Sequence, residues 1–293
     1  MRFGRTFERY ELRGERIRAH FTDGASTHAD LLVGADGANS RVRAQLLPHA
    51  RRVDTGVVAV AGKYRLAADD PRPALPGALL AGPTSVLPGR SGSMFTAVWR
   101  GDRQNAAAAD FVFDTTTDYV FWAYADAAGA FPPHAELVAL AGDALAGLVG
   151  ERIAGWAPGL RRLVAGSEPE TVHALRIRSA EPVAAWPTGP VTLLGDAIHN
   201  MTPMAGIGAN TALRDADLVR RMLIAVRDGA TPQPVAVADY ERQMLDYGFA
   251  AVAASLRNAR AAASGNRAAR HAFRTVLRVA DGVPALKRRM FAG

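Results

Sequence analysis

The chain has 293 residues and a net charge of +7, and with 49% hydrophobic and 22% charged residues it has the balance of an ordinary globular protein with one large or two small cores. It contains no cysteine, which excludes disulfides, thiolate metal sites and a cysteine nucleophile, and makes a cytoplasmic location the default expectation. No apolar run approaches the length of a membrane span and the first residues do not read as a secretory signal, so we expect neither.

The first elements in chain order read as short β-strands. Residues 5–12 and 17–21 alternate between apolar and polar side chains, and Thr-Asp-Gly at 22–24 is a hairpin signal. Residues 31–34, Leu-Leu-Val-Gly, form a run without polar side chains, which is typical of a strand buried on both faces of a parallel sheet. We therefore predict a small antiparallel meander that leads into a buried strand.

The middle of the chain is predicted to be mainly β. Residues 57–64, 93–99 and 110–124 are rich in valine, threonine and aromatic residues, and 171–178 reads as a returning strand. Apolar residues at helical spacing predict one helix over 134–149.

A second buried strand is expected at 190–194, and the rest of the chain is expected to be helical. Apolar residues between Leu213 and Val226 lie on one face of a helix that Gly229 can end. Further helices are predicted over 235–263 and roughly 267–280.

The positive charge is concentrated at the C-terminal end. Residues 252–293 contain nine arginines and lysines and a single acid, Asp281. Such a segment can bind nucleic acid or an anionic membrane, or it can be the solvated face of a helix. No pattern of interleaved aromatic residues supports base stacking, so we expect a solvated face and neither a nucleic-acid nor a membrane partner.

One chemically informative motif follows the first buried strand. The run from Leu31 to Arg43 places Asp36 and Gly37 directly after that strand, with Ser40 near the start of a helix. Ligands of open α/β sheets bind outside the carboxyl ends of strands, which favours a ligand contact for Asp36. A helix cap is the alternative interpretation of the same aspartate.

The other motif follows the second buried strand. Gly195-Asp196 opens a loop that passes Pro203 and reaches Gly206-x-Gly208, where a long helix begins. Free backbone N–H groups at a helix N-terminus favour negative charge, and glycines let a flat ligand approach the main chain. A lone G-x-G is weak evidence for a binding site, but the 22-residue pattern is much stronger evidence because many positions agree at fixed spacing.

These two stretches resemble the DG and GD fingerprints of the FAD-dependent aromatic hydroxylases, the group that includes p-hydroxybenzoate hydroxylase and the tetracycline-inactivating monooxygenases. The second follows the family pattern G-D-A-x-H-x-x-x-P-x-x-G-x-G-x-N-x-x-x-x-D-A without a gap, and the first follows D-G-x-x-S-x-x-R. The resemblance covers nearly all of the chain and says little about substrate.

The resemblance implies a flavin site and names its residues. Asp196 would bind the ribityl or pyrophosphate part of FAD, Asp36 and Gly37 would line the flavin and nicotinamide region, and Pro203 would lie along the isoalloxazine ring. The amides of residues 206–210 would face the N1–C2=O edge of the ring. The cofactor-binding residues are expected to be Asp36, Gly37, Arg43, Gly195, Asp196, Pro203, Gly206, Ile207, Gly208, Ala209 and Asn210.

Other roles stay open on the sequence. His199 is commonly histidine in the family and would lie near the flavin, and no metal is assigned because no second ligand stands at metal-binding spacing. Asn210 and Asp215 could contact the flavin or simply brace the start of the helix. No catalytic side chain is identified.

The resemblance also implies the fold and the activity. The fold is expected to be mixed α/β, with part of a glutathione-reductase-like Rossmann layer for FAD and NAD(P) in residues 1–52 and 180–293, including C-terminal helices. Residues 53–179 would form a β-rich substrate domain, with candidate lining residues Phe95, Trp99, Phe111, Phe113, Phe121 and Trp122. Ordinary core packing is the alternative for most of these aromatic residues. The expected activity is an NAD(P)H-dependent monooxygenase, or hydroxylase, of a small aromatic or polyketide-like substrate; halogenase relatives have less support.

The sequence departs from the family at its start. The family begins with a strand, G-x-G-x-x-G and a helix that bind the ADP part of FAD, and this chain has no such βαβ unit. We expect FAD binding to be weak or absent and the activity impaired, as in a truncated gene product. The alternatives are a non-catalytic remnant, which binds a small molecule or nothing, and a basic interaction protein.

Overall fold

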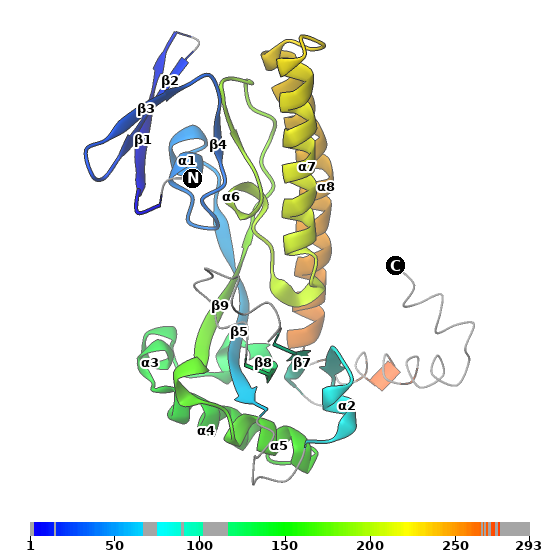
Figure 1. Ribbon diagram of the computed structural model, residues 1–293. Coiled ribbons are helices and arrows are strands. Elements are labelled where there is room, and N and C mark those ends of the chain that lie inside the picture. The colour runs from blue at the N-terminus through cyan, green and yellow to red at the C-terminus, as the bar shows by residue number, and fades with distance from the viewer. Residues whose placement is uncertain are drawn as a thin grey trace. The chain divides into compact units, whose positions relative to one another are not determined.

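The computed structural model describes residues 3–14, 16–66, 75–88, 91–101 and 117–264, together with positions 266, 268, 271, 272 and 275. The chain divides into two compact units (Figure 1): unit 1 is built from residues up to Thr55 and from Arg178–Ala259, and unit 2 from Gly56–Ile177 and from the residues after Ala259. Phe111, Phe113, most of the last predicted helix and most of the basic residues after 264 lie outside the described residues.

Unit 1 begins with the predicted antiparallel meander. Strands β1 (Phe7–Arg13), β2 (Arg16–Phe21) and β3 (Ser26–Ala29) pair in the order β1-β2-β3. The turn between β2 and β3 contains Gly24 at φ +81°, a left-handed conformation that glycine adopts without strain. This part of the sequence prediction is confirmed.

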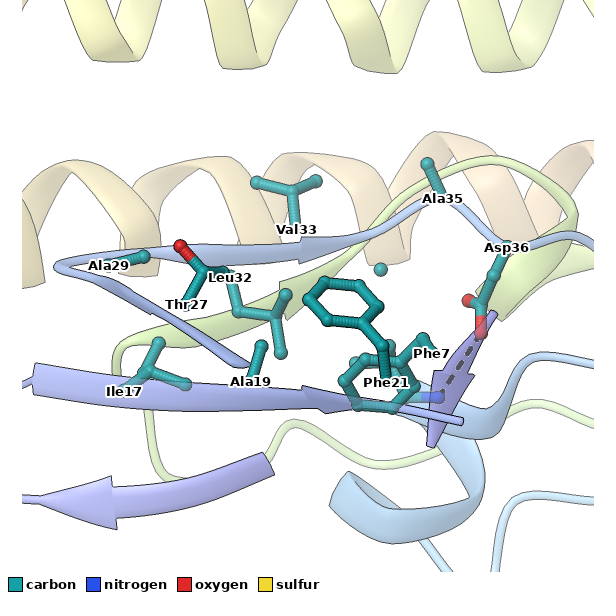
Figure 2. Close-up of a pocket in the computed structure, with 12 residues that line it drawn as sticks. Phe7, Ile17, Ala19, Phe21, Thr27, Ala29, Leu32, Val33, Ala35 and Asp36 are labelled. Atoms are coloured by element: carbon teal, nitrogen blue, oxygen red, sulfur yellow. Dashed lines mark hydrogen bonds between the residues drawn. The ribbon is translucent and has the colours of Figure 1, made fainter. Parts of the chain in front are cut away.

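The two strands that precede the motifs form a parallel pair. Strand β4 (Leu32–Gly34) lies beside β10 (Val191–Leu193), and Gly34 is in register with Leu193. Strand β10 is fully buried, as predicted, but Leu32 and Val33 of β4 are only half-buried. They line an open apolar groove together with Phe7 and Phe21 of the meander (Figure 2), so the expectation that β4 is covered on both faces is wrong for the described residues.

Four helices complete the described part of unit 1. They are α1 (Arg41–Leu46), α6 (Asp196–His199), α7 (Gly208–Arg227) and α8 (Gln233–Ala263). The long helices α7 and α8 share one apolar core with β10, through residues such as Val219, Met222, Tyr240, Met244 and Leu193. Helix α7 ends just before Gly229 at φ +71°, as the sequence predicted.

Unit 2 contains a five-stranded sheet in the order β6-β7-β8-β5-β9. Its strands are β5 (Arg52–Arg65), β6 (Thr84–Val86), β7 (Ser93–Trp99), β8 (Tyr119–Ala127) and β9 (His173–Ala180). Strand β8 pairs antiparallel with both β5 and β7. The β-rich character expected of this region is therefore present in the described strands.

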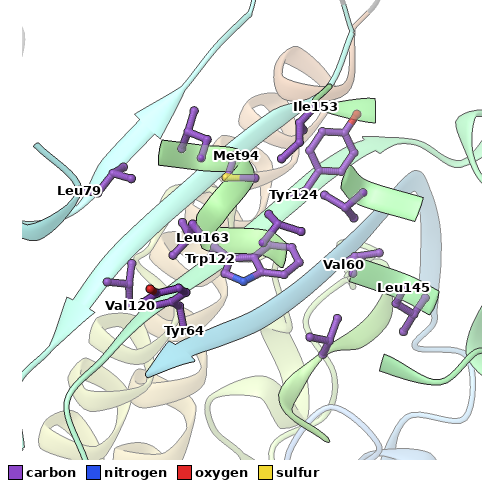
Figure 3. Packing of buried hydrophobic residues seen from close by; sticks show 14 of the residues in the cluster. Val60, Tyr64, Leu79, Met94, Val120, Trp122, Tyr124, Leu145, Ile153 and Leu163 are labelled. Atoms are coloured by element: carbon purple, nitrogen blue, oxygen red, sulfur yellow. The ribbon is translucent and has the colours of Figure 1, made fainter. Parts of the chain in front are cut away.

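Helices cover one face of the unit 2 sheet. They are α2 (Gly77–Leu80), α3 (His134–Ala139), α4 (Gly142–Arg152) and α5 (Pro158–Ala165). Val60, Trp122 and Tyr124 of the sheet pack with Leu145 and Leu163 of the helices in one core (Figure 3). The single helix predicted over 134–149 is instead two helices, α3 and α4, with a break at residues 140–141.

Among the described residues, no helix combines the length and the apolar character that crossing a bilayer requires.

Candidate functional site

The two sequence motifs leave neighbouring strands at the same end of the parallel pair. Gly34 and Leu193 are in register, and the amide of Leu194 donates a hydrogen bond to the carbonyl oxygen of Gly34 at 3.0 Å. Arg43 then links the loops, because its guanidinium donates to the carbonyl oxygens of Ala197 (2.7 Å) and Ala38 (3.0 Å). The structure thus brings the Asp36 and Asp196 loops together, as their positions after parallel strands predicted.

The carboxylate of the first motif acts as a helix cap. Asp36 accepts hydrogen bonds from the amides of Arg41 (2.7 Å) and Val42 (3.3 Å) and from the hydroxyl of Ser40. The Ser40 hydroxyl oxygen in turn accepts from the amide of Arg43 at 2.8 Å. Of the two interpretations that the sequence left open for Asp36, capping therefore accounts for its side chain, and the first turn of α1 has its amides satisfied.

Gly37 makes the turn between strand and helix. Its φ is +74°, in the left-handed region, and a Cβ atom there would meet nothing within 4 Å. The constraint at this position is therefore the backbone conformation and not lack of space. Gly37 is half-buried, whereas Asp36 is exposed.

The carboxylate of the second motif is exposed and has no hydrogen-bond partner among the described residues. Asp196 is the first residue of α6 and follows Gly195, which is buried and adopts φ +61°. Burial lowers the pKa of the Arg52 guanidinium, the positive charge of Arg178 lowers it further, and the negative charge of Asp196 opposes this shift. Asp196 thus stands near cations with both oxygens available to a ligand.

The N-terminus of α7 is open, in contrast to that of α1. Ile207 precedes the helix and supplies no side-chain cap, and the first turn contains no acidic residue. The first amides of an α-helix, here those of Gly208, Ala209 and Asn210, have no partner within the helix and carry its positive dipole end. Ala209 and Asn210 are exposed and Gly208 is half-buried. This end of α7 can accept an electron-rich ligand atom.

The loop between α6 and α7 presents backbone with little side-chain cover. Pro203 opens a 3-10 turn, Pro203–Ala205, and Gly206 follows at φ +66°. A Cβ atom at Gly206 would meet nothing within 4 Å, so a flat group can approach its main chain. Pro203 and Gly206 are exposed, and Ile207 is half-buried.

A buried polar layer supports this loop from behind. His199 and Asp215 are 1% and 0% exposed in their side chains, and His199 Nε2 lies 2.7 Å from an Asp215 carboxylate oxygen. Thr202 donates its hydroxyl hydrogen bond to Ser255, on helix α8. Asp215 therefore braces the loop, which decides between the two roles left open for it, whereas Asn210 is exposed. No local pattern in the sequence indicated the α8 partners, because they lie far along the chain.

Glu241 on α8 is a second buried carboxylate. It is 4% exposed and accepts hydrogen bonds from Trp186 Nε1 (3.1 Å) and from the hydroxyl of Thr188 (2.9 Å). Burial raises its pKa above the ordinary value of 4.5, although these hydrogen bonds oppose the shift.

The raised pKa predicts a pH dependence of stability. Between 4.5 and the raised pKa, the folded protein holds a proton on Glu241 that the unfolded chain releases. The free energy of unfolding should therefore fall as the pH rises through this window, and Glu241→Gln should remove that dependence. Chemical denaturation at a series of pH values above 4.5 measures it, and an unchanged slope in the variant would contradict the assignment.

The aromatic residues predicted to line a substrate pocket lie on two different faces of the unit 2 sheet. Trp122 is 0% exposed, lies in the core beneath the helices, and donates from Nε1 to Ser167 Oγ at 2.7 Å, so core packing is the alternative that holds for this residue. Phe95 and Trp99 are 41% and 44% exposed and belong to the opposite face, where Phe121 is half-buried. Alternation along each strand separates the two sets.

Comparison with known proteins identifies the family. Residues 164–255, which include the second motif, match a family model described as an FAD binding domain. A solved structure from Photorhabdus luminescens subsp. laumondii, described as a candidate FAD-containing monooxygenase, is 38% identical and has a TM-score of 0.77, with 88% of this chain and 68% of that chain covered. The chain belongs to the FAD-dependent aromatic hydroxylase family.

The curated relatives are longer than the part of them that this chain matches. The dual O-methyltransferase/FAD-dependent monooxygenase elcB of Phaeosphaeria nodorum is 32% identical over 73% of this chain and 26% of its own length. The FAD-dependent urate hydroxylase of Klebsiella pneumoniae is 29% identical over 84% of this chain and 56% of its own length. The chain thus spans between about a quarter and just over half of the length of these relatives.

Proposed function

We propose that this chain forms the flavin-facing part of an FAD-dependent monooxygenase that hydroxylates a small aromatic molecule with NAD(P)H and O₂. One observation carries the proposal. Within the described residues, the same motif contains an exposed carboxylate without a hydrogen-bond partner, at Asp196, and the open N-terminus of α7. Family membership supports the cofactor, and the lack of cysteine in the sequence supports a cytoplasmic location.

The residues fit an FAD molecule by their chemistry. The carboxylate of Asp196 accepts hydrogen bonds from ribityl hydroxyl groups, and the amides of Gly208, Ala209 and Asn210 donate to an electron-rich ring edge. Between Pro203 and Ile207 the loop has no polar side chain, so that a planar ring can lie against it. When bound, FAD supplies the redox and oxygen-activating chemistry, and the chain binds it, orients it and excludes water.

In this proposal the side chains of the first motif shape the site. Asp36 caps α1 and the Arg43 guanidinium is hydrogen-bonded to Ala38 and Ala197, so both shape the loops that receive the cofactor. We assign the direct ligand contact in this motif to the backbone around Gly37. Gly195 and Ile207 act through their backbone as well.

We base the proposed class of substrate on the compounds that the names of two relatives specify. A urate hydroxylase and a 6-hydroxynicotinate 3-monooxygenase are among them, and both names specify small, polar heteroaromatic rings. In unit 2, the sheet face with Phe95 and Trp99 offers exposed aromatic surface that can stack on such a ring. We assign that face to the substrate.

Flavin fluorescence titration tests the cofactor assignment. The wild-type chain should bind FAD measurably, even if weakly. Asp196→Ala should weaken this binding roughly tenfold or more, since a hydrogen bond to a charged group contributes about 1.5–3 kcal/mol. Asp217→Ala, at an exposed site on α7 that pairs with Arg220 and Arg221, is the matched control and should leave affinity unchanged. Equal affinity in the wild type and Asp196→Ala would refute the assignment.

Oxidation of NAD(P)H tests the activity itself. With bound FAD, addition of a heteroaromatic substrate should accelerate NAD(P)H oxidation and consume O₂. Tight FAD binding with no NAD(P)H oxidation would instead support a non-catalytic flavin-binding chain.

A further inference from the structure

The carboxylate of Asp215 is the most completely enclosed charged group in the described part of unit 1. It lies on α7 with 0% of its side chain exposed. It accepts hydrogen bonds from the amide of Gly195 (2.6 Å) and from the hydroxyl of Tyr247, and His199 Nε2 lies 2.7 Å away. A buried carboxylate is retained at low energetic cost only when its oxygens are fully satisfied, and here the surrounding groups satisfy them.

Each of these partners lies on a different element. Gly195 forms the turn before α6, His199 ends α6, and Tyr247 is part of α8. Asp215 therefore ties the start and the end of α6 to both long helices. Asp196, whose exposed carboxylate we assign to the flavin, lies between the two points that Asp215 holds.

The turn at Gly195 depends on this contact. Its φ of +61° directs the amide to Asp215 while Asp196, the next residue, remains exposed. A Cβ atom at Gly195 would lie 3.2 Å from the Cβ of Ala212, on the same helix as Asp215, so the turn is closely packed against α7.

The histidine is fixed as firmly as the carboxylate. An ionised carboxylate only accepts hydrogen bonds, so His199 Nε2 must carry the shared hydrogen. Its Nδ1 is buried without a hydrogen-bond partner in the described residues, so Nε2 makes the polar contact of the ring. A Cβ atom at Gly248 of α8 would lie 2.6 Å from His199 Cδ2, so α8 packs directly against the ring.

Tyr247 completes the arrangement. Burial raises the pKa of its hydroxyl, and the hydrogen bond to Asp215 raises it further, so it stays protonated and donates. Its ring is covered by the guanidinium of Arg214, with 3.8 Å between the guanidinium carbon and the ring centroid.

We propose that Asp215 is a positioning residue of the flavin site: through Gly195 and His199 it fixes the turn that presents Asp196, and Tyr247 holds Asp215 in place. This inference rests on the proposed function. It assigns the histidine and the distal aspartate of the second motif to support of the loop, and Asp196 to the ligand.

Flavin affinity of paired variants tests this proposal. Asp215→Asn should weaken FAD binding roughly tenfold or more, because the new side-chain NH₂ group faces at least one of the groups that now donate to the carboxylate. Tyr247→Phe should weaken FAD binding several-fold. Two controls are matched: Asp217→Asn changes an exposed acid on the same helix, and Glu241→Gln changes another buried, hydrogen-bonded carboxylate of unit 1. Both should bind FAD like the wild type.

A readout on the ligand-free protein separates positioning from general stability. Hydrogen exchange of the Gly195 amide should be slow in the wild type and faster in Asp215→Asn and Tyr247→Phe, while Glu241→Gln leaves it slow. The nitrogen NMR shifts of His199 should report a hydrogen on Nε2 in the wild type and should change in Asp215→Asn. If the wild type fails to bind FAD, the proposed function fails, and the exchange data alone then decide whether Asp215 fixes the turn. The inference is overturned if Gly195 exchanges rapidly in the wild type, or if Glu241→Gln and Asp215→Asn weaken FAD binding equally.

Discussion

Replacing Gly34 with alanine is expected to lower the free energy of unfolding of the chain by about 1–3 kcal/mol, because the position has no room for a methyl group. The added Cβ atom would lie 2.7 Å from Leu193 Cδ2 and 2.8 Å from Val42 Cβ, which belong to β10 and α1. Relief of these contacts has to separate the parallel strands or displace the helix. Both motif loops follow directly from those elements, so FAD affinity should fall as well.

Chemical denaturation measures the first effect, with Gly189→Ala as the control. Gly189 also lies in unit 1 and does not adopt a positive φ, and a Cβ atom added there would meet nothing within 4 Å. Its change to alanine should therefore alter the free energy of unfolding by no more than about 0.5 kcal/mol. A Gly34→Ala variant as stable as Gly189→Ala would mean that β4, β10 and α1 are not packed as described.

The tryptophans of unit 2 provide the second large expected effect. Trp122→Ala should lower the free energy of unfolding by about 3–5 kcal/mol, because it removes a fully buried ring and the hydrogen bond to Ser167. Trp99→Ala removes a ring of the same size that is 44% exposed and stacks on Tyr119 with ring centroids 6.4 Å apart, so its cost should be about 1 kcal/mol.

The comparison of the two variants tests which face of the sheet is available to a substrate. Trp99→Ala should alter substrate affinity in a protein that keeps its stability, whereas Trp122→Ala should act through stability. Equal losses of stability in the two variants would show that the faces of β7 and β8 have been assigned wrongly.

Local patterns in the sequence were sufficient to predict much of unit 1. Alternating residues and a glycine turn predicted the meander, an uninterrupted apolar run predicted β4, and a mainly apolar run predicted β10. Because parallel strands carry their following loops to one edge of a sheet, the proximity of the Asp36 and Asp196 loops was also predictable.

Contacts between distant residues account for what the sequence did not predict. The break between α3 and α4 places Gly142 against Pro169, so closely that a Cβ atom added at Gly142 would lie 1.7 Å from the carbonyl oxygen of Pro169. The spacing of apolar residues along the sequence gives no information about this contact. The burial of Trp122 follows from the register of β8, which decides the face of each residue and was not known. Tyr247 meets Asp215 only through the packing of α8 on α7.

The two helix N-termini also differ for a reason that only the three-dimensional arrangement reveals. Each helix begins after an aspartate of its motif. The first amides of α1 donate to Asp36 and Ser40, whereas the first amides of α7 have no side-chain cap. The sequence predicted ligand contact for both loops. We propose that helix amides donate to the ligand only at the second loop, while the first contributes its backbone around Gly37.

A residue-resolved map of backbone amide shifts on addition of FAD would test this conclusion most directly. We expect the amide signals of Gly208, Ala209, Asn210 and Asp196 to shift strongly. The signals of Arg41 and Val42, whose amides already donate to Asp36, should change little. Shifts confined to α1, or spread over residues remote from both loops, would contradict the assignment of the flavin to the second loop.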